Sequence, residues 1–391
     1  MKKRALIIFS FFCVLATLCY AQTDSVVVGA ARLNEYLPMI HKKRVALFSN
    51  HTGLVEGRHT LDVLLEHRVK VTALFSPEHG FRGNADAGEH VSSGKDPSTG
   101  VPIYSLYDGR SRYPSQQSMK TFDVLLVDIQ DVGLRYYTYY ISMMRLMEAC
   151  ARYGKKVVVL DRPNPNGMYV DGPILDMKYK SGVGLLPIPV VHGLTLGELA
   201  RMAIGEHWLD KKTQSLDLKV IPCLHYTHGT RYTLPVAPSP NLPDMKSVYL
   251  YPSLCYFEGT VVSLGRGTDK PFRIYGHPGM VGYSFNFTPK SVPGAKNPPL
   301  LNKLCFGVDL SSLANEDIVS HKICLDYVIN AYRNLNMGEK FFTPFFEKLI
   351  GVSYVRTMIM EGKSSDEIRS RWNTDVEKFK ELRKPYLLYS E

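Results

Sequence analysis

Short apolar segments alternate with longer amphipathic ones through the first part of this 391-residue chain, and this alternation restricts the possible folds more than any other feature. Helices are predicted at about 57–67, 115–120 and 136–153. Between them lie runs rich in Val, Ile, Leu and Phe that have the length of buried strands, at 44–48, 69–75, 102–104, 123–127 and 156–160. Strand–helix alternation predicts an α/β fold, a parallel sheet with helices on both faces in a Rossmann-like layout.

The rest of the chain, from about residue 168, has a less regular pattern. Pro and Gly are dense from 222 to 299, and the clear helices are predicted at 195–206, about 318–334 and 364–382. We expect a Rossmann-like catalytic domain over 22–167 and an α+β auxiliary domain over 168–391 that forms one wall of a cleft. The composition, with 45% hydrophobic and 21% charged residues, excludes a disordered or low-complexity chain.

The N-terminus has the features of a secretory signal peptide over residues 1–21. Lys2-Lys3-Arg4 precedes an apolar run over 5–20 that is too short for a membrane span, and Ala21 offers a small residue before a cut at Gln22. Lipidation at Cys19 is the alternative, and the bulky residue before that cysteine disfavours it. We expect an exported protein, periplasmic or secreted, with no transmembrane segment.

The net charge is mildly basic. Lys and Arg number 47 against 37 Asp and Glu, a formal net charge of +10 that falls by three to +7 when the signal peptide is removed. No dense run of Lys and Arg occurs, so nucleic-acid binding is not expected.

Polar and Gly-rich loops follow each of the five predicted strands. Parallel strands bring their carboxyl ends to one edge of a sheet, where α/β proteins bind ligands. We therefore expect these loops to build one site. They cover 49–53, 76–83 running on to 87–90, 107–110, 128–135 and 161–167.

Several common active-site signatures are missing from the sequence. No GxGxxG or GxxxxGK[ST] follows a strand, which disfavours a nicotinamide or ATP cofactor. No GxSxG is present, which disfavours a serine hydrolase. No HExxH occurs, and the histidines of the loops lack metal-ligand spacing. We therefore predict neither a cofactor nor a catalytic metal.

The acidic residues of these loops fit glycoside hydrolysis instead. That reaction needs one protonated carboxyl group for the leaving oxygen, and a second group that supports the developing positive charge, supplies a nucleophile or orients a water. Glu78 follows a buried strand beside Pro77 and Phe81, and a partly apolar setting would keep its carboxyl group protonated near neutral pH. The candidates for the second group are Glu89, Asp128 and Asp131.

Structural roles are the alternatives for the same residues. Asp128 or Asp131 could cap the helix that follows its strand. Glu78 could form a buried ion pair with Arg82. The tyrosines at 136–140 could serve helix packing or stack on a sugar ring.

Six sequence blocks resemble one known family, the exo-β-N-acetylmuramidases among the glycoside hydrolases. They occur in the family's order, and the similarity extends from about residue 26 to 389, so the resemblance is specific. The blocks are SPEHGFRG at 76–83, AGEHV at 87–91, VDIQDVGLRYYTY at 127–139, LDRPNPNG at 160–167, PSPNLP at 238–243 and GRGTDKPF at 265–272.

The resemblance implies an active-site cleft between a Rossmann-like domain and an auxiliary domain. It also implies release of terminal N-acetylmuramic acid from the non-reducing ends of peptidoglycan fragments, with muropeptides or disaccharides as substrates and Glu78 as the leading catalytic residue. The sugar carries a lactyl carboxylate, for which we expect Arg82 and Arg135 to be ligands. The full set of predicted substrate-binding residues is Asn50, His51, His79, Arg82, Arg135, Tyr137, Asn164, Asn241 and Arg266.

Two other classes of protein stay open at this point. One is a non-catalytic muropeptide-binding protein that uses the same cleft. The other is a metal-dependent amidase or deacetylase that would use His51, His79 or His90. Within the glycosidase hypothesis, retaining, inverting and substrate-assisted mechanisms all agree with these residues.

Overall fold

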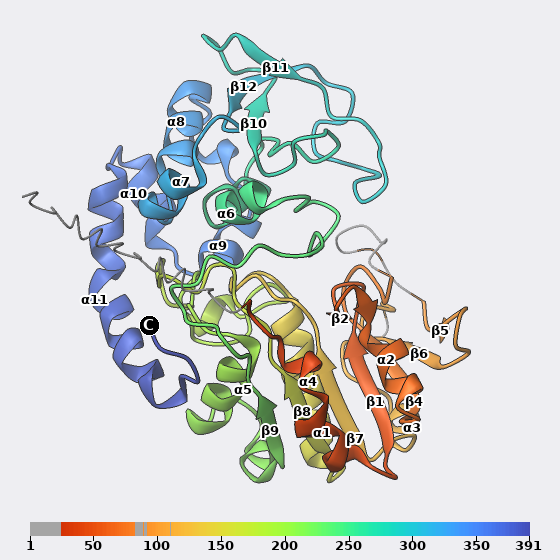
Figure 1. Ribbon diagram of the computed structural model, residues 1–391. Helices are drawn as coiled ribbons and strands as arrows, with labels where there is room; N and C mark the ends of the chain where they lie inside the picture. Colours follow the sequence, from red (N-terminus) through yellow and green to blue (C-terminus); the bar gives the residue numbers. More distant parts are fainter. Residues whose placement is uncertain (1–24, 83–88, 90–91, 110) are drawn as a thin grey trace, which may run out of the picture.

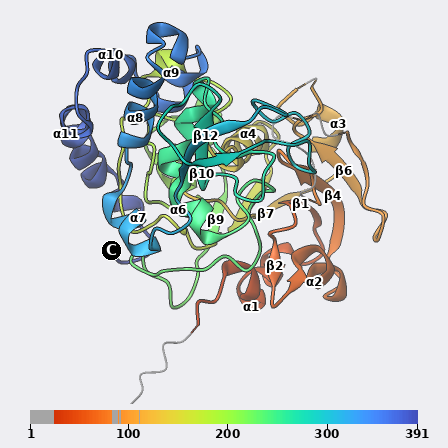
Figure 2. The same cartoon turned by 90° about the horizontal axis from the view of Figure 1, so that it is seen from above.

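The computed structural model describes residues 25–82, 89, 92–109 and 111–391 (Figure 1). The predicted signal peptide over 1–21, with its cleavage site and Cys19, lies outside the described residues, and so does His90. Figures 1 and 2 show a central sheet with its helices and, beside it, a second group of helices around a smaller sheet.

Seven strands form the central sheet, in the order β5-β6-β4-β1-β7-β8-β9. Every neighbouring pair is parallel except β5 with β6. The prediction of a Rossmann-like parallel sheet is therefore confirmed, and each predicted strand lies within a residue or two of an observed one. The strands are β1 Arg44–Ser49, β4 Lys70–Ser76, β5 Gly94–Lys95, β6 Pro102–Ser105, β7 Val124–Asp128, β8 Lys156–Leu160 and β9 Leu218–Ile221.

Helices cover both faces of this sheet because the strand side chains alternate between two cores. In β1, Ala46 and Phe48 pack into the core that contains α4 (Tyr139–Arg152), whereas Val45 and Leu47 pack into the core of the opposite face. That second core takes its helical residues from α1 (Leu33–Ile40) and α2 (Thr60–Glu66). The shorter elements of this region are β2 Leu54–Val55, β3 Arg58–His59 and α3 Gln116–Met119.

The sheet continues past residue 167, where the sequence pattern places the end of the first domain. Its last strand, β9, pairs with β8, and α5 (Leu196–Gly205) packs beside both strands. The pattern does not reveal β9 because an edge strand pairs on one side only and needs no continuous apolar run. Its four residues are Leu, Lys, Val and Ile, and only Ile221 is buried.

The second half folds around α6 (Met245–Leu254) and an antiparallel sheet in the order β10-β12-β11. The predicted helix at 318–334 is wrong as a single element. It breaks at Lys322, because the next two N–H groups, of Ile323 and Cys324, bond to Asp171 and Ser253 instead of continuing the helix. The elements are β10 Ile274–His277, β11 Phe285–Phe287, β12 Cys305–Asp309, α7 Asn315–His321, α8 Asp326–Leu335, α9 Phe345–Ile350, α10 Tyr354–Met360 and α11 Ser365–Arg383.

The two halves share one large core and are joined at the C-terminus. Residues of β1, α4, α6 and α11 belong to the same buried cluster. After α11 the chain returns to the central sheet, where Tyr389 donates a hydrogen bond to Asp161 at 2.7 Å. Short 3₁₀ helices complete the fold: η1 Gly29–Ala31, η2 Met177–Tyr179, η3 Lys211–Ser215, η4 Cys255–Gly259, η5 Gly338–Phe341 and η6 Lys384–Tyr386. No helix in the described ranges is both long and apolar enough to cross a membrane.

Candidate active site

A small pocket of about 90 Å³ lies where the loop after β4 and the start of α4 meet loops of the second half. Residues of both halves are needed to form it. Its lining is Glu78, His79, Tyr136, Tyr137, Thr138, Tyr139, Val183, Ser239, Asn241, Leu242, Tyr251, Glu258, Arg266 and Phe272.

Glu78 is half-buried in the wall of this pocket. The hydroxyl group of Thr138 donates to Oε2 of Glu78 at 2.6 Å. Thr138 is the N-cap residue of α4, yet its side chain makes no capping bond to that helix. The hydroxyl group that would ordinarily cap a helix therefore orients the carboxyl group of Glu78.

His79 stands beside Glu78 in a tight turn and is buried. Its φ of 69° lies in the left-handed region, which is uncommon for a residue with a side chain. The turn is closed by a bond from the Gly80 N–H group to the Pro77 carbonyl at 3.1 Å. The backbone at the end of β4 thus turns sharply, and both Glu78 and His79 line the pocket.

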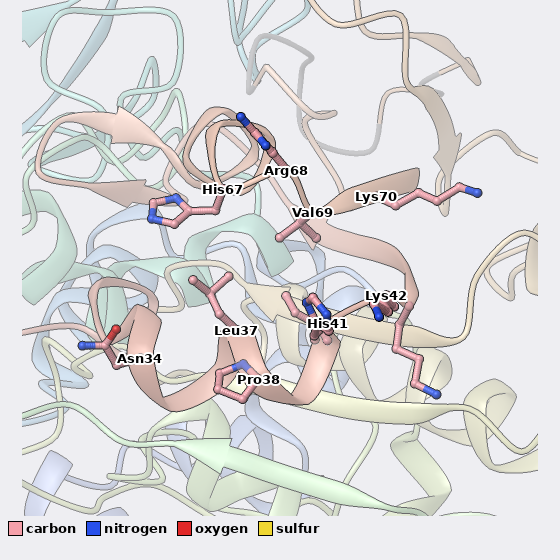
Figure 3. A pocket seen from close by; sticks show the side chains of 11 residues that line it. Asn34, Leu37, Pro38, His41, Lys42, His67, Arg68, Val69 and Lys70 are labelled. Atoms are coloured by element: carbon pink, nitrogen blue, oxygen red, sulfur yellow. The ribbon is translucent and has the colours of Figure 1, made fainter.

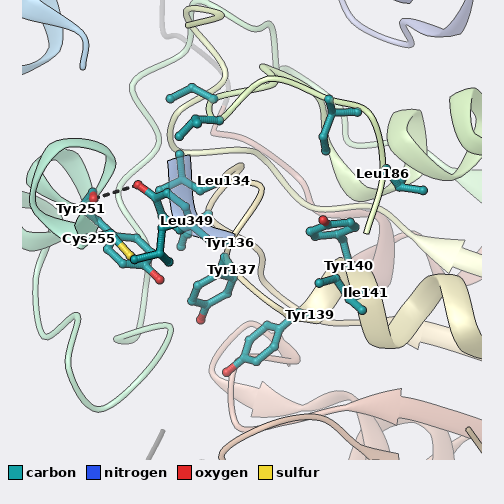
Figure 4. Packing of buried hydrophobic residues seen from close by; sticks show 14 of the residues in the cluster. Leu134, Tyr136, Tyr137, Tyr139, Tyr140, Ile141, Leu186, Tyr251, Cys255 and Leu349 are labelled. Atoms are coloured by element: carbon teal, nitrogen blue, oxygen red, sulfur yellow. Dashed lines mark hydrogen bonds between the residues drawn. The ribbon is translucent and has the colours of Figure 1, made fainter. Parts of the chain in front are cut away.

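The tyrosines at the start of α4 join the two halves at the pocket (Figure 4). Tyr137 and Tyr139 both donate to the carbonyl oxygen of Pro238, at 2.8 and 3.1 Å, and their ring centroids are 4.6 Å apart. Tyr136 donates to the carbonyl oxygen of Tyr251 at 3.0 Å. Burial raises the pKa of the Tyr137 phenol well above its usual value, so the ring stays neutral. These rings are both packed in the core and part of the pocket wall.

Arg266 and Glu258 form an ion pair on the second-half side of the pocket. Nε of Arg266 donates to Oε1 of Glu258 at 2.8 Å, and the guanidinium group lies over the ring of Phe272 at 5.1 Å. Arg266 was predicted from the sequence, but Glu258 was not. It lies in η4, away from any predicted strand end, and the Phe-Glu-Gly sequence around it carries no recognisable signal.

His51 connects the loop after β1 to the loop that carries Pro238, whereas the side chain of Asn50 bonds within its own loop. Nε2 of His51 lies 2.8 Å from the Ala237 carbonyl oxygen, and burial lowers the pKa of His51, so a neutral ring donates this bond. Oδ1 of Asn50 accepts from both the N–H and the hydroxyl group of Thr52, at 3.0 and 2.6 Å. Neither residue is among those that line the pocket.

Asp128 has a structural position, which corrects the prediction of a catalytic role. Its carboxylate is fully buried and accepts two bonds from Arg162, Nε to Oδ1 at 2.6 Å and Nη2 to Oδ2 at 3.0 Å. The hydroxyl group of Thr60, the first residue of α2, also donates to Oδ2, at 2.5 Å. Charge and lone pairs are thus satisfied inside the protein, and Asp128 does not line the pocket.

Asp131 is buried in the loop before α4 and does not line the pocket. Oδ1 accepts from the Gly133 N–H group at 2.8 Å, and Oδ2 is buried with no hydrogen-bond partner among the described residues. The Gly133 bond stays within this loop, so it does not cap α4. Burial raises the pKa of Asp131 to about 7.

Arg135 corrects a second prediction, because it cannot bind the lactyl carboxylate. Its side chain is completely buried and donates to four backbone carbonyl oxygens. Nη1 bonds to Pro173 and Ile188 at 2.6 and 2.9 Å, and Nη2 bonds to Leu349 and Ile350 at 2.9 and 2.7 Å. The guanidinium group therefore joins distant segments of the chain and does not face the pocket.

Three other predicted residues also lie outside the pocket lining. Glu89 is half-buried and pairs with Lys296 at 2.7 Å. Arg82 pairs with the buried carboxylate of Asp96. The ion-pair partner of Arg82 is therefore Asp96 and not Glu78, the partner considered from the sequence. Asn164 donates to the Leu194 carbonyl oxygen at 2.9 Å. These contacts give the three residues partners other than a substrate.

Asn164 also explains one glycine of the loop after β7. Gly133 has a φ of 76°, and a Cβ atom added to it would lie 2.1 Å from Oδ1 of Asn164. Only glycine lets the loops after β7 and β8 come this close, because any side chain at this position would collide with Asn164.

Of the predicted residues, the pocket thus gathers Glu78, His79, Tyr137, Asn241 and Arg266. Nδ2 of Asn241 donates to the Gly294 carbonyl oxygen at 2.8 Å, which orients its side chain. Thr138 was not predicted as a site residue, although it lies inside the block at 127–139, because a threonine between tyrosines gives no sign of which carboxylate it will reach. Within the described part of the chain, no three His, Cys, Asp or Glu side chains gather as metal ligands.

Comparison with known proteins gives matches along nearly the whole described chain. The family profile for the N-terminal part of exo-β-N-acetylmuramidase NamZ matches residues 45–246, and the profile for its C-terminal part matches 249–389. The first range contains β9, and the two ranges meet at the start of α6. The peptidoglycan β-N-acetylmuramidase NamZ of Bacillus subtilis (strain 168) is 39% identical over 377 residues, which cover 91% of this chain and 89% of that protein.

Two crystal structures of DUF1343 family proteins from Bacteroides fragilis NCTC 9343 have the same fold. One is 63% identical, with a TM-score of 0.88, and the match covers 94% of this chain and 99% of that one. The other is 28% identical, with a TM-score of 0.74, and covers 93% and 99%.

Proposed function

This chain belongs to the exo-β-N-acetylmuramidase family, and we propose that it releases N-acetylmuramic acid from the non-reducing ends of peptidoglycan fragments. The observation that carries this proposal is the position of Glu78 in a pocket formed by both halves of the chain. A pocket between two halves suits an exo-acting enzyme, which binds a chain end. Muropeptides and disaccharides are the substrates expected.

We assign Glu78 as the general acid. The pocket lining contains two carboxyl groups, those of Glu78 and Glu258, and Glu258 is occupied by Arg266. The hydroxyl group of Thr138 holds one oxygen of Glu78 and fixes the rotation of the carboxyl group. A positioned acid of this kind contributes about 10²–10⁴-fold to the rate.

The second group of the mechanism is best supplied by the substrate. Asp128 is neutralised by Arg162, Asp131 is buried outside the pocket lining, and Glu89 pairs with Lys296. N-acetylmuramic acid has a 2-acetamido oxygen that can attack its own anomeric carbon while Glu78 protonates the departing glycosidic oxygen. The Glu78 carboxylate then takes a proton from the water that opens the resulting oxazolinium ion, which restores the acetamido group and gives a product with retained configuration.

A fluorinated substrate distinguishes this route from attack by an enzyme carboxylate. Exchange of the N-acetyl group for N-trifluoroacetyl makes the amide oxygen a poorer nucleophile. We expect kcat for a chromogenic muraminide to fall steeply with this exchange and the first product to keep its configuration, as followed by NMR. An unchanged kcat would exclude the acetamido route.

Arg266 is the arginine that we propose for the lactyl carboxylate. It is the arginine of the pocket lining, whereas Arg135 and Arg82 have other partners. Its contact with Glu258 uses Nε and Nη2. Nη1 has no bond with a described residue and provides the donor for an acidic substituent.

The central experiment compares the wild type with Glu78→Gln on a chromogenic β-N-acetylmuraminide. We expect turnover to fall by about 10²–10⁴-fold while the thermal unfolding curve stays the same. Glu89→Gln serves as the control and should keep wild-type turnover, since its side chain pairs with Lys296. A chelator tests the amidase alternative in the same assay, because it should leave a metal-independent glycosidase unchanged. Undiminished turnover by Glu78→Gln would refute the assignment.

We also propose that the protein is exported. The basic start, the apolar run over 5–20 and the small residue at Ala21 support this proposal. Export would bring the enzyme to the compartment that contains cell-wall fragments. N-terminal sequencing of the protein from its native host tests the proposed cut after Ala21.

A further inference from the structure

A second hollow lies beside the starts of β1 and β4, at the opposite end of the strands from Glu78 (Figure 3). It has a volume of about 490 Å³ and is open to solvent. It is formed by the end of α1 and the turn into β1 on one side, and by the turn from α2 into β4 on the other. Glu78 follows the other end of β4, a strand of seven residues, so about 20 Å of sheet separates the two sites.

This hollow, which we call the basic groove, has a one-sided charge. No acidic side chain lines it. Six of its lining residues are basic, namely His41, Lys42, Lys43, His67, Arg68 and Lys70. Among the described residues, the two lysines after α1, Arg68 and Lys70 have no ion-pair partner. The neighbouring Arg44 and Arg58, by contrast, pair with Asp123 and Glu66.

The two helices beside the groove end in the same way. His41 follows the last residue of α1 and precedes Lys42 with a φ of 56°, and His67 follows α2 and precedes Arg68 with a φ of 56°. This left-handed position after a helix ordinarily takes glycine, because a side chain there costs about 1 kcal/mol. At both helix ends the sequence has a cation instead.

Helix stabilisation explains only part of this arrangement. A cation near a helix C-terminus offsets the helix dipole, which accounts for one basic residue at each end. It does not account for Lys43, which precedes β1, or for Lys70, which is the first residue of β4. Nor does it account for a hollow between two neighbouring turns that no acidic residue lines. Leu37, Pro38 and Val69 add apolar surface to the same hollow.

We propose that the basic groove binds a peptidoglycan strand through its free carboxylates, as a contact separate from the active site. The four unpaired cations match the lactyl and peptide-stem carboxylates of such a strand, and the apolar side chains match its methyl groups and sugar faces. The choice of this polymer rests on the proposed function. Binding here would hold the enzyme on the cell wall while the pocket removes chain ends.

The experiment measures retention of the full chain on purified, insoluble peptidoglycan sacculi by sedimentation. Every protein carries Glu78→Gln, so the sacculi are not consumed. The test variant is Lys42→Gly/Arg68→Gly, which removes two cations and places glycine at two left-handed positions, so the fold is not weakened. The matched control is Lys211→Gln/Lys212→Gln, which removes two exposed cations of η3.

We expect the test variant to bind sacculi several-fold to about tenfold more weakly, and the control variant to bind as the parent does. Added salt should weaken the binding of the parent protein to sacculi and reduce the difference in binding between the parent and the test variant. With Glu78 restored, Lys42→Gly/Arg68→Gly should hydrolyse a small chromogenic muraminide at the wild-type rate. The wild-type enzyme, with Glu78 and all groove cations present, is assayed beside it. If the wild-type enzyme releases no sugar from the muraminide while retention on sacculi still depends on the groove cations, the proposed function fails and the groove proposal stands.

Three results would overturn the proposal. Unchanged retention of the test variant would show that the cations serve only the helix ends. Equal loss in both variants would show a general effect of net charge. If the test variant lost binding to anionic phospholipid vesicles but kept the parent's retention on sacculi, the groove would be assigned to a membrane surface.

Discussion

Thr138 donates its hydroxyl hydrogen to Oε2 of Glu78 at 2.6 Å, across 60 residues of sequence. This bond joins the start of α4 to the loop after β4, and it uses the side chain that would otherwise cap α4. The carboxyl group in the pocket is thus oriented by a residue that follows β7, a strand separated from β4 by β1 in the sheet.

Removal of this hydroxyl group should impair catalysis more than folding. In Thr138→Val, Glu78 loses the bond that orients it, and a bond to a carboxylate contributes about 1.5–3 kcal/mol. We expect kcat on a chromogenic muraminide to fall about 10–100-fold, with a small change in KM. Thr138→Ser keeps the hydroxyl group and should recover most of kcat. Equal kcat for the valine and serine variants would show that the bond has no positioning role.

Arg266 should determine preference for a substrate with a lactyl group. Arg266→Lys keeps a charge beside Glu258 but loses the planar guanidinium group, so we expect KM for a muraminide to rise about tenfold with kcat little changed. The corresponding N-acetylglucosaminide lacks the carboxylate, and its kcat/KM should change less. Arg82→Lys is the control, since Arg82 pairs with Asp96 outside the pocket lining. An equal loss of kcat/KM on the muraminide and on the N-acetylglucosaminide would refute the assignment of Arg266 to the lactyl carboxylate.

Asp131 should make the protein less stable as the pH rises. Burial raises its pKa to about 7, against about 3.9 for an exposed aspartate. Between these values the folded chain holds a proton that the unfolded chain has released, so the free energy of unfolding decreases with increasing pH. Asp131→Asn has no such proton, and its stability relative to the wild type should rise by about 1–4 kcal/mol between pH 4.5 and 7.5, as measured by urea unfolding.

The same Asp131→Asn variant tests whether this residue takes part in the reaction. Its amide oxygen can still accept from the Gly133 N–H group, so we expect turnover within about tenfold of the wild type. Parallel stability curves for the two proteins would contradict the pH prediction. A loss of turnover as large as that of Glu78→Gln would make Asp131 a member of the catalytic machinery.

Arg135 should be essential for stability. Its guanidinium group satisfies four buried carbonyl oxygens, two of them at the end of α9. Arg135→Met leaves these oxygens without a donor, and we expect a loss of about 3–5 kcal/mol in the free energy of unfolding. Arg152→Met is the matched control, because Arg152 forms an exposed pair with Asp210 and should contribute about 1 kcal/mol or less. Similar unfolding midpoints for both variants would contradict the structural role.

Much of the fold follows from local pattern. Buried parallel strands need continuous apolar runs, and the runs at 44–48, 123–127 and 156–160 became β1, β7 and β8. The loop that carries Glu78 could be located because parallel strands share one carboxyl edge. Elements without such a constraint escaped prediction. They include β9 at the sheet edge and α6, which lies within the Pro-rich region and contains Pro252.

The sequence alone determined the Rossmann-like class and the edge of the sheet that carries the pocket, because these depend on spacing along the chain. The role of Glu78 as the acid stays a prediction. Only the tertiary structure decided the partner of each charged group. Asp128 and Arg135 lie within eight positions of each other, yet they bond to Arg162 and to carbonyl groups near residue 350. A side chain's role depends on which distant group enters its bonding distance, and long-range packing sets that distance.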